Sequence, residues 1–260
     1  MKLWTLLENT ACRQDLTAAH GLSLYLETGG HRILFDMGPS AAFRQNGDVL
    51  GIDPAAVDLA ILSHGHDDHG GGMAEFLRCN AGAPLYVHGQ AFRPHYNRAG
   101  KYIGLDPALR NHPRLIFTED SCHLAAGLDL YTCNDRVPAY PVDHSGLQAL
   151  VGDRLEPDDF CHEQYLLVQE QGKRILISGC SHKGVCNLVH WFRPDILVGG
   201  FHLKDKDPAD PSLPVLAENL LRYDTVYYTG HCTGSAQYRR LKEMMGHRLQ
   251  SFSTGTVLEL

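Results

Sequence analysis

The sequence lacks any apolar stretch of the roughly 20 residues that a membrane-spanning helix requires. Its first apolar run, residues 3–7, is interrupted at Glu8, too early for a secretory signal peptide. It also lacks an excess of positive charge, since 23 Lys and Arg stand against 30 Asp and Glu, whereas general nucleic-acid surfaces are usually basic. These absences predict a cytoplasmic protein that binds neither membrane nor nucleic acid and whose partner is a small molecule.

Paired cysteines are absent as well. The eight cysteines contain no CxxC pair and no compact framework, which is typical of reduced thiols used one at a time. The hydrophobic fraction of 43% and the charged fraction of 20% are those of a folded globular protein. With 260 residues the chain is long enough to bury a substantial core, in one large domain or two small ones.

Histidine, in contrast, is abundant, and one stretch concentrates it. Residues 63–72 read Ser-His-Gly-His-Asp-Asp-His-Gly-Gly-Gly after the apolar run 57–62, so the motif lies on a predicted loop from a buried strand to a helix. Side chains two apart in extended backbone point the same way, so His64 and His66 can bind one ion. Asp68 and His69 then face a second ion.

Two ions held in this way can clamp the attacking and leaving oxygens of a hydrolytic reaction. Imidazole and carboxylate ligands favour zinc, with iron or manganese as alternatives. A polar loop whose histidines only face water is the simpler interpretation of one histidine, but four ligands at this spacing favour metal binding. We therefore expect two divalent transition-metal ions.

The order of strand, glycine and histidine recurs later in the chain. Residues 174–179 precede Cys180 and His182, residues 195–200 precede His202, and residues 224–230 precede His231. Ligands of α/β proteins bind beyond the carboxyl ends of strands. We therefore expect these loops and the main motif to converge on one pocket.

Other segments have weaker signals. Hairpins are predicted at residues 20–36 and 164–179, and helices at residues 185–192, 215–222 and 235–245, whereas the chain from residue 133 to Pro157 is predicted to be irregular. The carboxylate of Asp36, at a strand end, either orients a metal-bound histidine or caps the following helix. Residues 89–113 are basic and aromatic without periodicity, which predicts an excursion that covers the site.

The pattern His64-x-His66-x-Asp68-His69 after an apolar strand resembles the signature of the metallo-β-lactamase superfamily. Over nearly the whole chain, the sequence is similar to the branch named for 7,8-dihydropterin-6-yl-methyl-4-(β-D-ribofuranosyl)aminobenzene 5′-phosphate synthase. The similarity rests on residues 20–23, 34–36, 46, 63–72, 88, 163–164, 179–182, 199–203 and 231–234. It implies an α/β fold of the four-layer αββα type, in a single domain over residues 1–260.

The resemblance also implies a role for each site residue. His64, His66 and His182 would bind the first metal, and Asp68, His69 and His231 the second. Cys180 occupies the position nearest to the superfamily's bridging aspartate. It is either a zinc-bound thiolate or an inert buried thiol, and the sequence favours neither. The expected catalytic residues are Asp68 and His202, and the expected substrate-binding residues are His20, His88 and Lys204.

These expectations describe a dinuclear metal-dependent enzyme that hydrolyses a small anionic, phosphate- or pterin-like substrate. The synthase reaction, a group transfer that releases diphosphate, uses the same kind of site. The first alternative is a metal-holding sensor or binding protein for a pterin-like ligand, without turnover. The second is a diiron oxidoreductase, which should carry an acid in the first cluster and usually a flavin partner.

Overall fold

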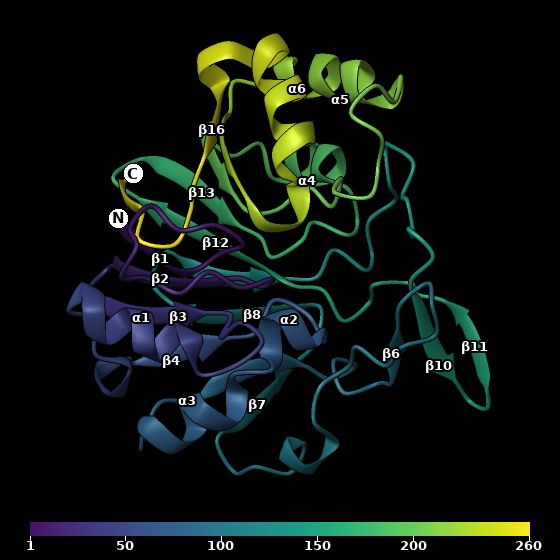
Figure 1. Cartoon of the computed structure of the whole chain (residues 1–260). Coiled ribbons are helices and arrows are strands. Elements are labelled where there is room, and N and C mark those ends of the chain that lie inside the picture. Colours follow the sequence, from purple (N-terminus) through teal and green to yellow (C-terminus); the bar gives the residue numbers. More distant parts are fainter.

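Two seven-stranded sheets stack face to face in the computed structural model, which describes all residues 1–260 (Figure 1). In order across the first sheet, the strands are β17 (Val257–Glu259), β1 (Lys2–Leu7), β2 (Ser23–Thr28), β3 (His31–Phe35), β4 (Leu59–Ile61), β5 (Leu85–His88) and β7 (Leu115–Thr118). Strands β3, β4, β5 and β7 run parallel to one another. The strand before the histidine motif, β4, is thus central in this sheet.

The second sheet carries the other histidine loops. Its strands, in order, are β16 (Leu249–Ser251), β15 (Val226–Thr229), β14 (Ile196–Val198), β13 (Lys173–Ile177), β12 (Tyr165–Glu170), β9 (Leu128–Tyr131) and β8 (Ser121–Ala125). Strands β13, β14 and β15 are parallel neighbours. Their carboxyl ends therefore lie at the same edge of the sheet.

Helices cover the outer faces of both sheets (Figure 1). The first sheet carries α1 (Ala42–Leu50), α2 (Asp67–Gly70) and α3 (Met73–Cys79), and the second carries α4 (Val185–Phe192), α5 (Ser212–Leu221) and α6 (Ser235–Met245). The predicted four-layer αββα order is confirmed. Helix α5 begins at Ser212 rather than Val215, because Pro214 is tolerated in a first helical turn. No helix combines the length and the apolar character needed to cross a bilayer.

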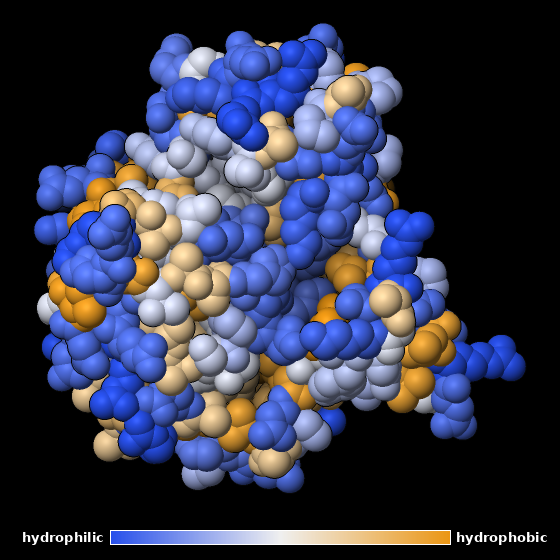
Figure 2. Space-filling view, viewed as in Figure 1, coloured by the Kyte–Doolittle hydropathy of each residue, from blue (hydrophilic) through white to orange (hydrophobic).

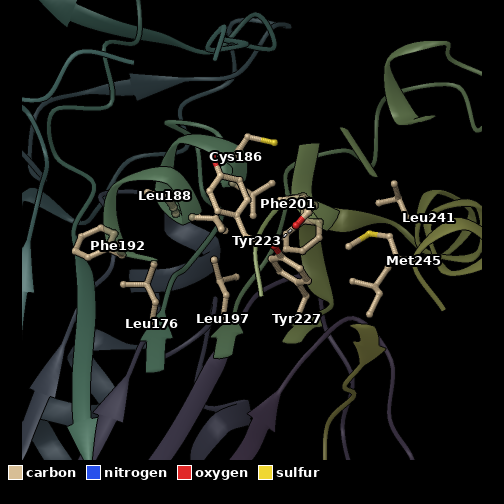
Figure 3. Packing of buried hydrophobic residues seen from close by; sticks show 14 of the residues in the cluster. Leu176, Cys186, Leu188, Phe192, Leu197, Phe201, Tyr223, Tyr227, Leu241 and Met245 are labelled. Atoms are coloured by element: carbon tan, nitrogen blue, oxygen red, sulfur yellow. Dashed lines mark hydrogen bonds between the residues drawn. The ribbon is translucent and has the colours of Figure 1, made fainter. Parts of the chain in front are cut away.

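The core consists of three apolar layers. Ile175 and Ile177 of β13 belong to the layer between the sheets, while Leu176 between them belongs to the layer under the helices. In that outer layer, Leu197 and Tyr227 of the second sheet pack beneath the helices (Figure 3). Because the strands are buried on both faces, their sequences are nearly continuous apolar runs.

A small third sheet corrects the prediction of irregular chain before Pro157. It consists of β11 (Arg154–Pro157), β10 (Gln148–Val151) and β6 (His95–Tyr96). All four residues of β11 are exposed, so the hairpin has no alternation of apolar and polar residues. Strand β6 belongs to the excursion of residues 89–113, and its pairing with β10 ties that excursion to the rest of the chain. Strand β8, which is five residues long and has no fully buried residue, was also not predicted.

Candidate metal centre

The loops that follow β4, β13, β14 and β15 meet where the carboxyl ends of the two sheets come together. Their side chains form two adjoining and overlapping clusters, whose histidines and Cys180 are buried and whose Asp68 is half-buried. The first consists of His64, His66 and His182, and the Nε2 atoms of His64 and His182 are 3.3 Å apart. Burial and the neighbouring histidines hold the pKa values of His64 and His182 well below the usual range. These rings are therefore neutral, the form that binds a metal.

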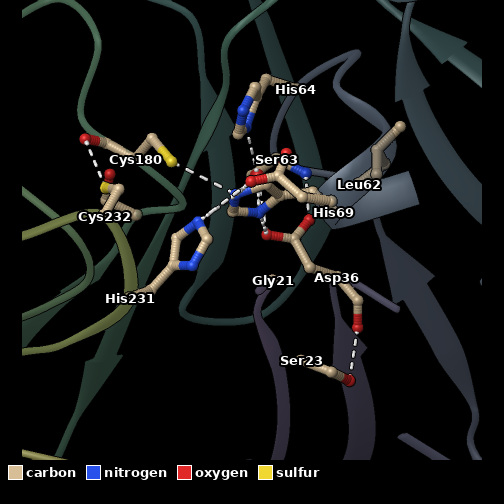
Figure 4. Close-up of polar contacts among 12 residues, drawn as sticks. Gly21, Ser23, Asp36, Leu62, Ser63, His64, His69, Cys180, His231 and Cys232 are labelled. Carbon is tan, nitrogen blue, oxygen red and sulfur yellow. Dashed lines mark hydrogen bonds and ion pairs between the residues drawn. The ribbon is translucent and has the colours of Figure 1, made fainter. Parts of the chain in front are cut away.

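The second cluster surrounds His69 (Figure 4). Its Nε2 lies 3.2 Å from His231 Nε2 and 3.2 Å from Cys180 Sγ, and Asp68 Oδ2 lies 3.3 Å from His231 Nε2. Burial alone lowers the pKa of His69, but the carboxylates of Asp36 and Asp68 outweigh it and raise the pKa to about 9. The same negative field favours a bound cation.

Three histidines of these clusters are each anchored through one ring nitrogen. Their Nδ1–H groups donate to an oxygen: His64 to Ser63 Oγ at 2.8 Å, His69 to Asp36 Oδ2 at 2.7 Å, and His231 to Asn9 Oδ1 at 2.9 Å. The lone pair of Nε2 then points into the cluster, an arrangement typical of metal-bound histidine. Atoms bound tetrahedrally at 2.0–2.1 Å from zinc lie about 3.3 Å from one another. The residues present therefore fit a metal centre.

Asp36 thus orients His69. Its alternative interpretation as a helix cap is wrong, because α1 has Ala41 at its N-cap and no side-chain cap. Asp36 is fully buried, and its Oδ1 also accepts the backbone N–H of Ser63 at 2.7 Å. Asp36, Ser181, His202 and His231 all have positive φ, between 48° and 61°. Such backbone is costly outside glycine and concentrates at functional sites.

Two glycines allow the loops to approach closely. A Cβ on Gly179 would lie 2.2 Å from Ser63 Oγ, and a Cβ on Gly200 would lie 2.3 Å from Cys232 Sγ. Any side chain at either position would push the site loops apart. This steric requirement explains why the strand ends carry glycine before the histidines.

Both clusters border a cavity of about 750 Å³, and Figure 2 shows a hollow on this face with largely hydrophilic side chains around it. The excursion supplies Arg98 and Lys101 to its lining, and neither has an acidic partner within 4 Å. The loop after β14 supplies Lys204, whose Nζ lies 2.8 Å from His20 Nε2. The lining also contains Asp67, Asp143 and Asp205, so the cavity is of mixed charge, with the clustered histidines at its base.

The remaining predicted residues are divided between this cavity and the protein interior. His20, His202 and Lys204 line the cavity, and the ring of His202 lies 4.3 Å from that of His182. The buried Nδ1 of His202 has no hydrogen-bond partner. His88 lies elsewhere: it ends β5, its Nδ1 accepts the N–H of Gln90 at 3.2 Å, and it is not among the lining residues. Its predicted contact with substrate has no support in the structure.

Sequence reasoning missed three buried residues, Asp158, His95 and His162, which surround His66 of the first cluster. Asp158 Oδ2 lies 2.8 Å from His95 Nδ1, 3.3 Å from His162 Nε2 and 3.8 Å from His66 Nε2. Burial opposes ionisation of Asp158, but hydrogen bonds from the histidines hold its pKa far below the usual range. His95 and His162 lie outside any strand-end motif, and the only signal was the unusual histidine content.

Two further neighbours of the ligands were also missed. Cys232 Sγ accepts the backbone N–H of His202 at 3.3 Å, and Glu163 accepts the backbone N–H of His182 at 2.8 Å. Both hold the loops that carry site histidines. The pairs Cys232–Thr233 and Glu163–Gln164 were noted only as part of the family resemblance, so no role was predicted for them.

Comparison with known proteins agrees with this geometry. Over its full length, the chain is 26% identical to the 7,8-dihydropterin-6-methyl-4-(β-D-ribofuranosyl)-aminobenzene-5′-phosphate synthase of Methanocaldococcus jannaschii, of which the match covers 96%. The structure of Tm1679, a metal-dependent hydrolase of the β-lactamase superfamily, matches with a TM-score of 0.83 at 23% identity, covering 100% of this chain and 99% of that one.

A diphosphatase from the PhnP family shares the fold at a TM-score of 0.55 and 15% identity, with 100% and 97% of the two chains covered. The family model described as the metallo-beta-lactamase superfamily matches residues 16–231. These residues include the histidine motif, the anchoring Asp36 and all the strand-end ligands. The chain therefore belongs to the metallo-β-lactamase superfamily.

Proposed function

We propose that this protein is a dinuclear metal-dependent enzyme that hydrolyses a small anionic substrate carrying a phosphoryl group. The observation that carries the proposal is the group of anchored histidines at the base of a cavity whose lining includes Arg98 and Lys101, two cations without an acidic partner. Family membership supports it, and so does the cavity volume of about 750 Å³, which is typical of sites for small molecules.

In this proposal, His64, His66 and His182 hold the first ion, and Asp68, His69 and His231 hold the second. Burial raises the pKa of the Cys180 thiol well above its usual range, so Cys180 would become a thiolate only on binding the second ion, for which its Sγ is placed 3.2 Å from His69 Nε2. When bound, such ions lower the pKa of a coordinated water toward 7 and polarise a phosphoryl or carbonyl oxygen. The first cluster contains no acid, which favours zinc or manganese chemistry over a diiron oxidoreductase.

The rest of the site binds and orients the substrate. Arg98 and Lys101, which have no acidic partner, attract its anionic groups at the rim, and Lys204 does so from the opposite loop, held beside His20. His202 lines the cavity beside His182, where its imidazole donates to a phosphate oxygen or to the leaving group. Asp68, beside His231, helps to hold the attacking water in line.

A second candidate is a group transfer that releases diphosphate. The full-length similarity to the M. jannaschii synthase favours it. The two reactions make different demands, since hydrolysis needs one organic substrate and water, whereas transfer needs two organic substrates. In both reactions the site stabilises negative charge on phosphate oxygens.

The test combines metal analysis with turnover. The protein is stripped by chelation, reconstituted with zinc or manganese, and assayed with a phosphodiester, a lactone and a diphosphate ester, the last with and without an arylamine acceptor. We expect up to two ions per chain and turnover that chelation abolishes. His66→Ala should lose the first ion and the turnover, whereas His123→Ala, at an exposed histidine on β8, should keep the ions and the turnover.

The outcomes separate the alternatives. Reconstituted protein with no bound transition metal would overturn the metal centre itself. Two bound ions without turnover of any substrate would favour a binding or sensor protein. Diphosphate release only in the presence of the arylamine would favour the transfer reaction.

A further inference from the structure

Asp158 lies beneath the first cluster as a buried carboxylate among three histidines and an arginine. Besides the histidine contacts of its Oδ2, its Oδ1 accepts the N–H of Phe160 at 2.9 Å and lies 3.4 Å from Arg93 Nη2. With His66, His95 and His162 it has the spacing of a possible metal site. The group is therefore either a third ion site or a hydrogen-bonded support for the first.

The proton positions decide between these two interpretations. Gly65 donates its backbone N–H to Nδ1 of His162 at 2.9 Å, so that nitrogen carries a lone pair. Neutral His162 then carries its proton on Nε2 and donates it to Asp158. To bind an ion among the four residues, His162 would need a lone pair on Nε2. Its proton would then be on Nδ1 and would point at the N–H of Gly65. Two donors would face each other in a buried place, which is costly.

His95 completes the support from another part of the chain. Its Nδ1 lies 2.8 Å from Asp158 Oδ2, a normal length for a charge-assisted hydrogen bond. It belongs to β6, which pairs with β10, so the small third sheet holds this donor in place. Asp158 is thus fixed by donors that do not bind metal themselves.

We infer that Asp158 is the positioning residue for His66. The Nε2 of His66 lies 3.8 Å from Asp158 Oδ2, is buried, and has no partner at hydrogen-bond distance. A proton on that nitrogen is stabilised by the carboxylate, which leaves the Nδ1 lone pair for the first ion alongside His64 and His182. A shift of less than about 1 Å closes the hydrogen bond. This inference rests on the proposed metal centre but not on any substrate.

Substitution with a matched control tests this role. Asp158→Asn keeps the size of the side chain and removes its charge. Partners behind metal-binding histidines are typically worth 10–100-fold in affinity, so one of the two ions should bind about 10–100-fold more weakly and the other normally. Asp129→Asn is the control, because Asp129 pairs with exposed His123 at 2.7 Å, away from the site. Competition with a chromophoric chelator measures both affinities, and unchanged binding in Asp158→Asn would overturn the inference.

A second measurement uses the wild-type protein and decides the matter even if Asp158→Asn fails to fold. The histidine rings are labelled with ¹⁵N and observed by NMR while zinc is added, with signals assigned from His95→Gln and His162→Gln. We expect His66 to keep a proton on Nε2 and bind zinc through Nδ1, while His95 and His162 keep their ring protons. Loss of a ring proton from His95 or His162 on zinc addition would instead establish a third ion site and overturn the inference.

These readouts separate this inference from the proposed function. If the wild-type protein binds no metal, both the proposed function and the positioning role of Asp158 are refuted. If the wild-type protein binds two ions and Asp158→Asn binds both with wild-type affinity, only the role of Asp158 is refuted.

Discussion

Replacing Asp36 tests how far the anchors behind the ligands stabilise the metal centre. Its Oδ2 accepts hydrogen bonds from His69 Nδ1 and Ser63 Oγ, both at 2.7 Å, in a fully buried position. Its φ of 61° lies in the left-handed region, which asparagine adopts more readily than alanine does. Asp36→Asn therefore removes the charge alone, whereas Asp36→Ala also strains the backbone.

The structure gives the expected magnitudes. Hydrogen bonds to a charged group contribute about 1.5–3 kcal/mol, so the free energy of unfolding of metal-free Asp36→Asn should fall by about that amount. Asp36→Ala should lose roughly a further 1–2 kcal/mol from left-handed backbone. The second ion should bind about 10–100-fold more weakly in Asp36→Asn, or about 1.4–2.8 kcal/mol.

Urea unfolding followed by circular dichroism measures the first quantity, and chelator competition measures the second. Asp53→Asn is a suitable control, since Asp53 caps the short helical turn Pro54–Ala56 by accepting the N–H of Ala55 at 2.9 Å. It should leave metal affinity unchanged. If Asp36→Asn bound both ions with wild-type affinity, the reasoning that anchored imidazoles build this site would be refuted.

Three other changes follow from the same geometry. Asp68→Ala should deplete one ion more than the other, and equal loss of both by elemental analysis would contradict a divided site. His202→Ala should keep near-normal metal content and lose about 10²–10⁴-fold in rate as a general acid; loss of a metal would instead place His202 in a coordination shell and displace His182 from it. Leu197→Ala, in the buried layer under the helices, should cost about 2–5 kcal/mol by calorimetry, whereas exposed Val215→Ala should cost less than about 0.5 kcal/mol.

The sequence pattern alone was sufficient to place histidines at the ends of four strands, whereas the four layers were predicted from the resemblance to the superfamily. Apolar runs ended by glycine and histidine mark β4, β13, β14 and β15, and the covalent spacing of His64, His66, Asp68 and His69 dictates which side chains share a direction. These are local properties of the chain. They survive in any fold that buries the strands, so periodicity and spacing were enough to predict them.

Only the tertiary structure decided which distant residues support those ligands. In the small third sheet, β6 has only two residues and β11 is exposed, so neither strand has a periodic signal, yet this sheet holds His95 beside Asp158. Asn9 anchors His231 across 222 positions, and His162 accepts from Gly65 across 97. Such contacts depend on how the two sheets and their loops pack. A single hydrogen-bonding side chain has no periodic sequence pattern from which its partner could be predicted. Buried polar groups need hydrogen-bond partners, but the packing of the folded chain determines which residue becomes the partner.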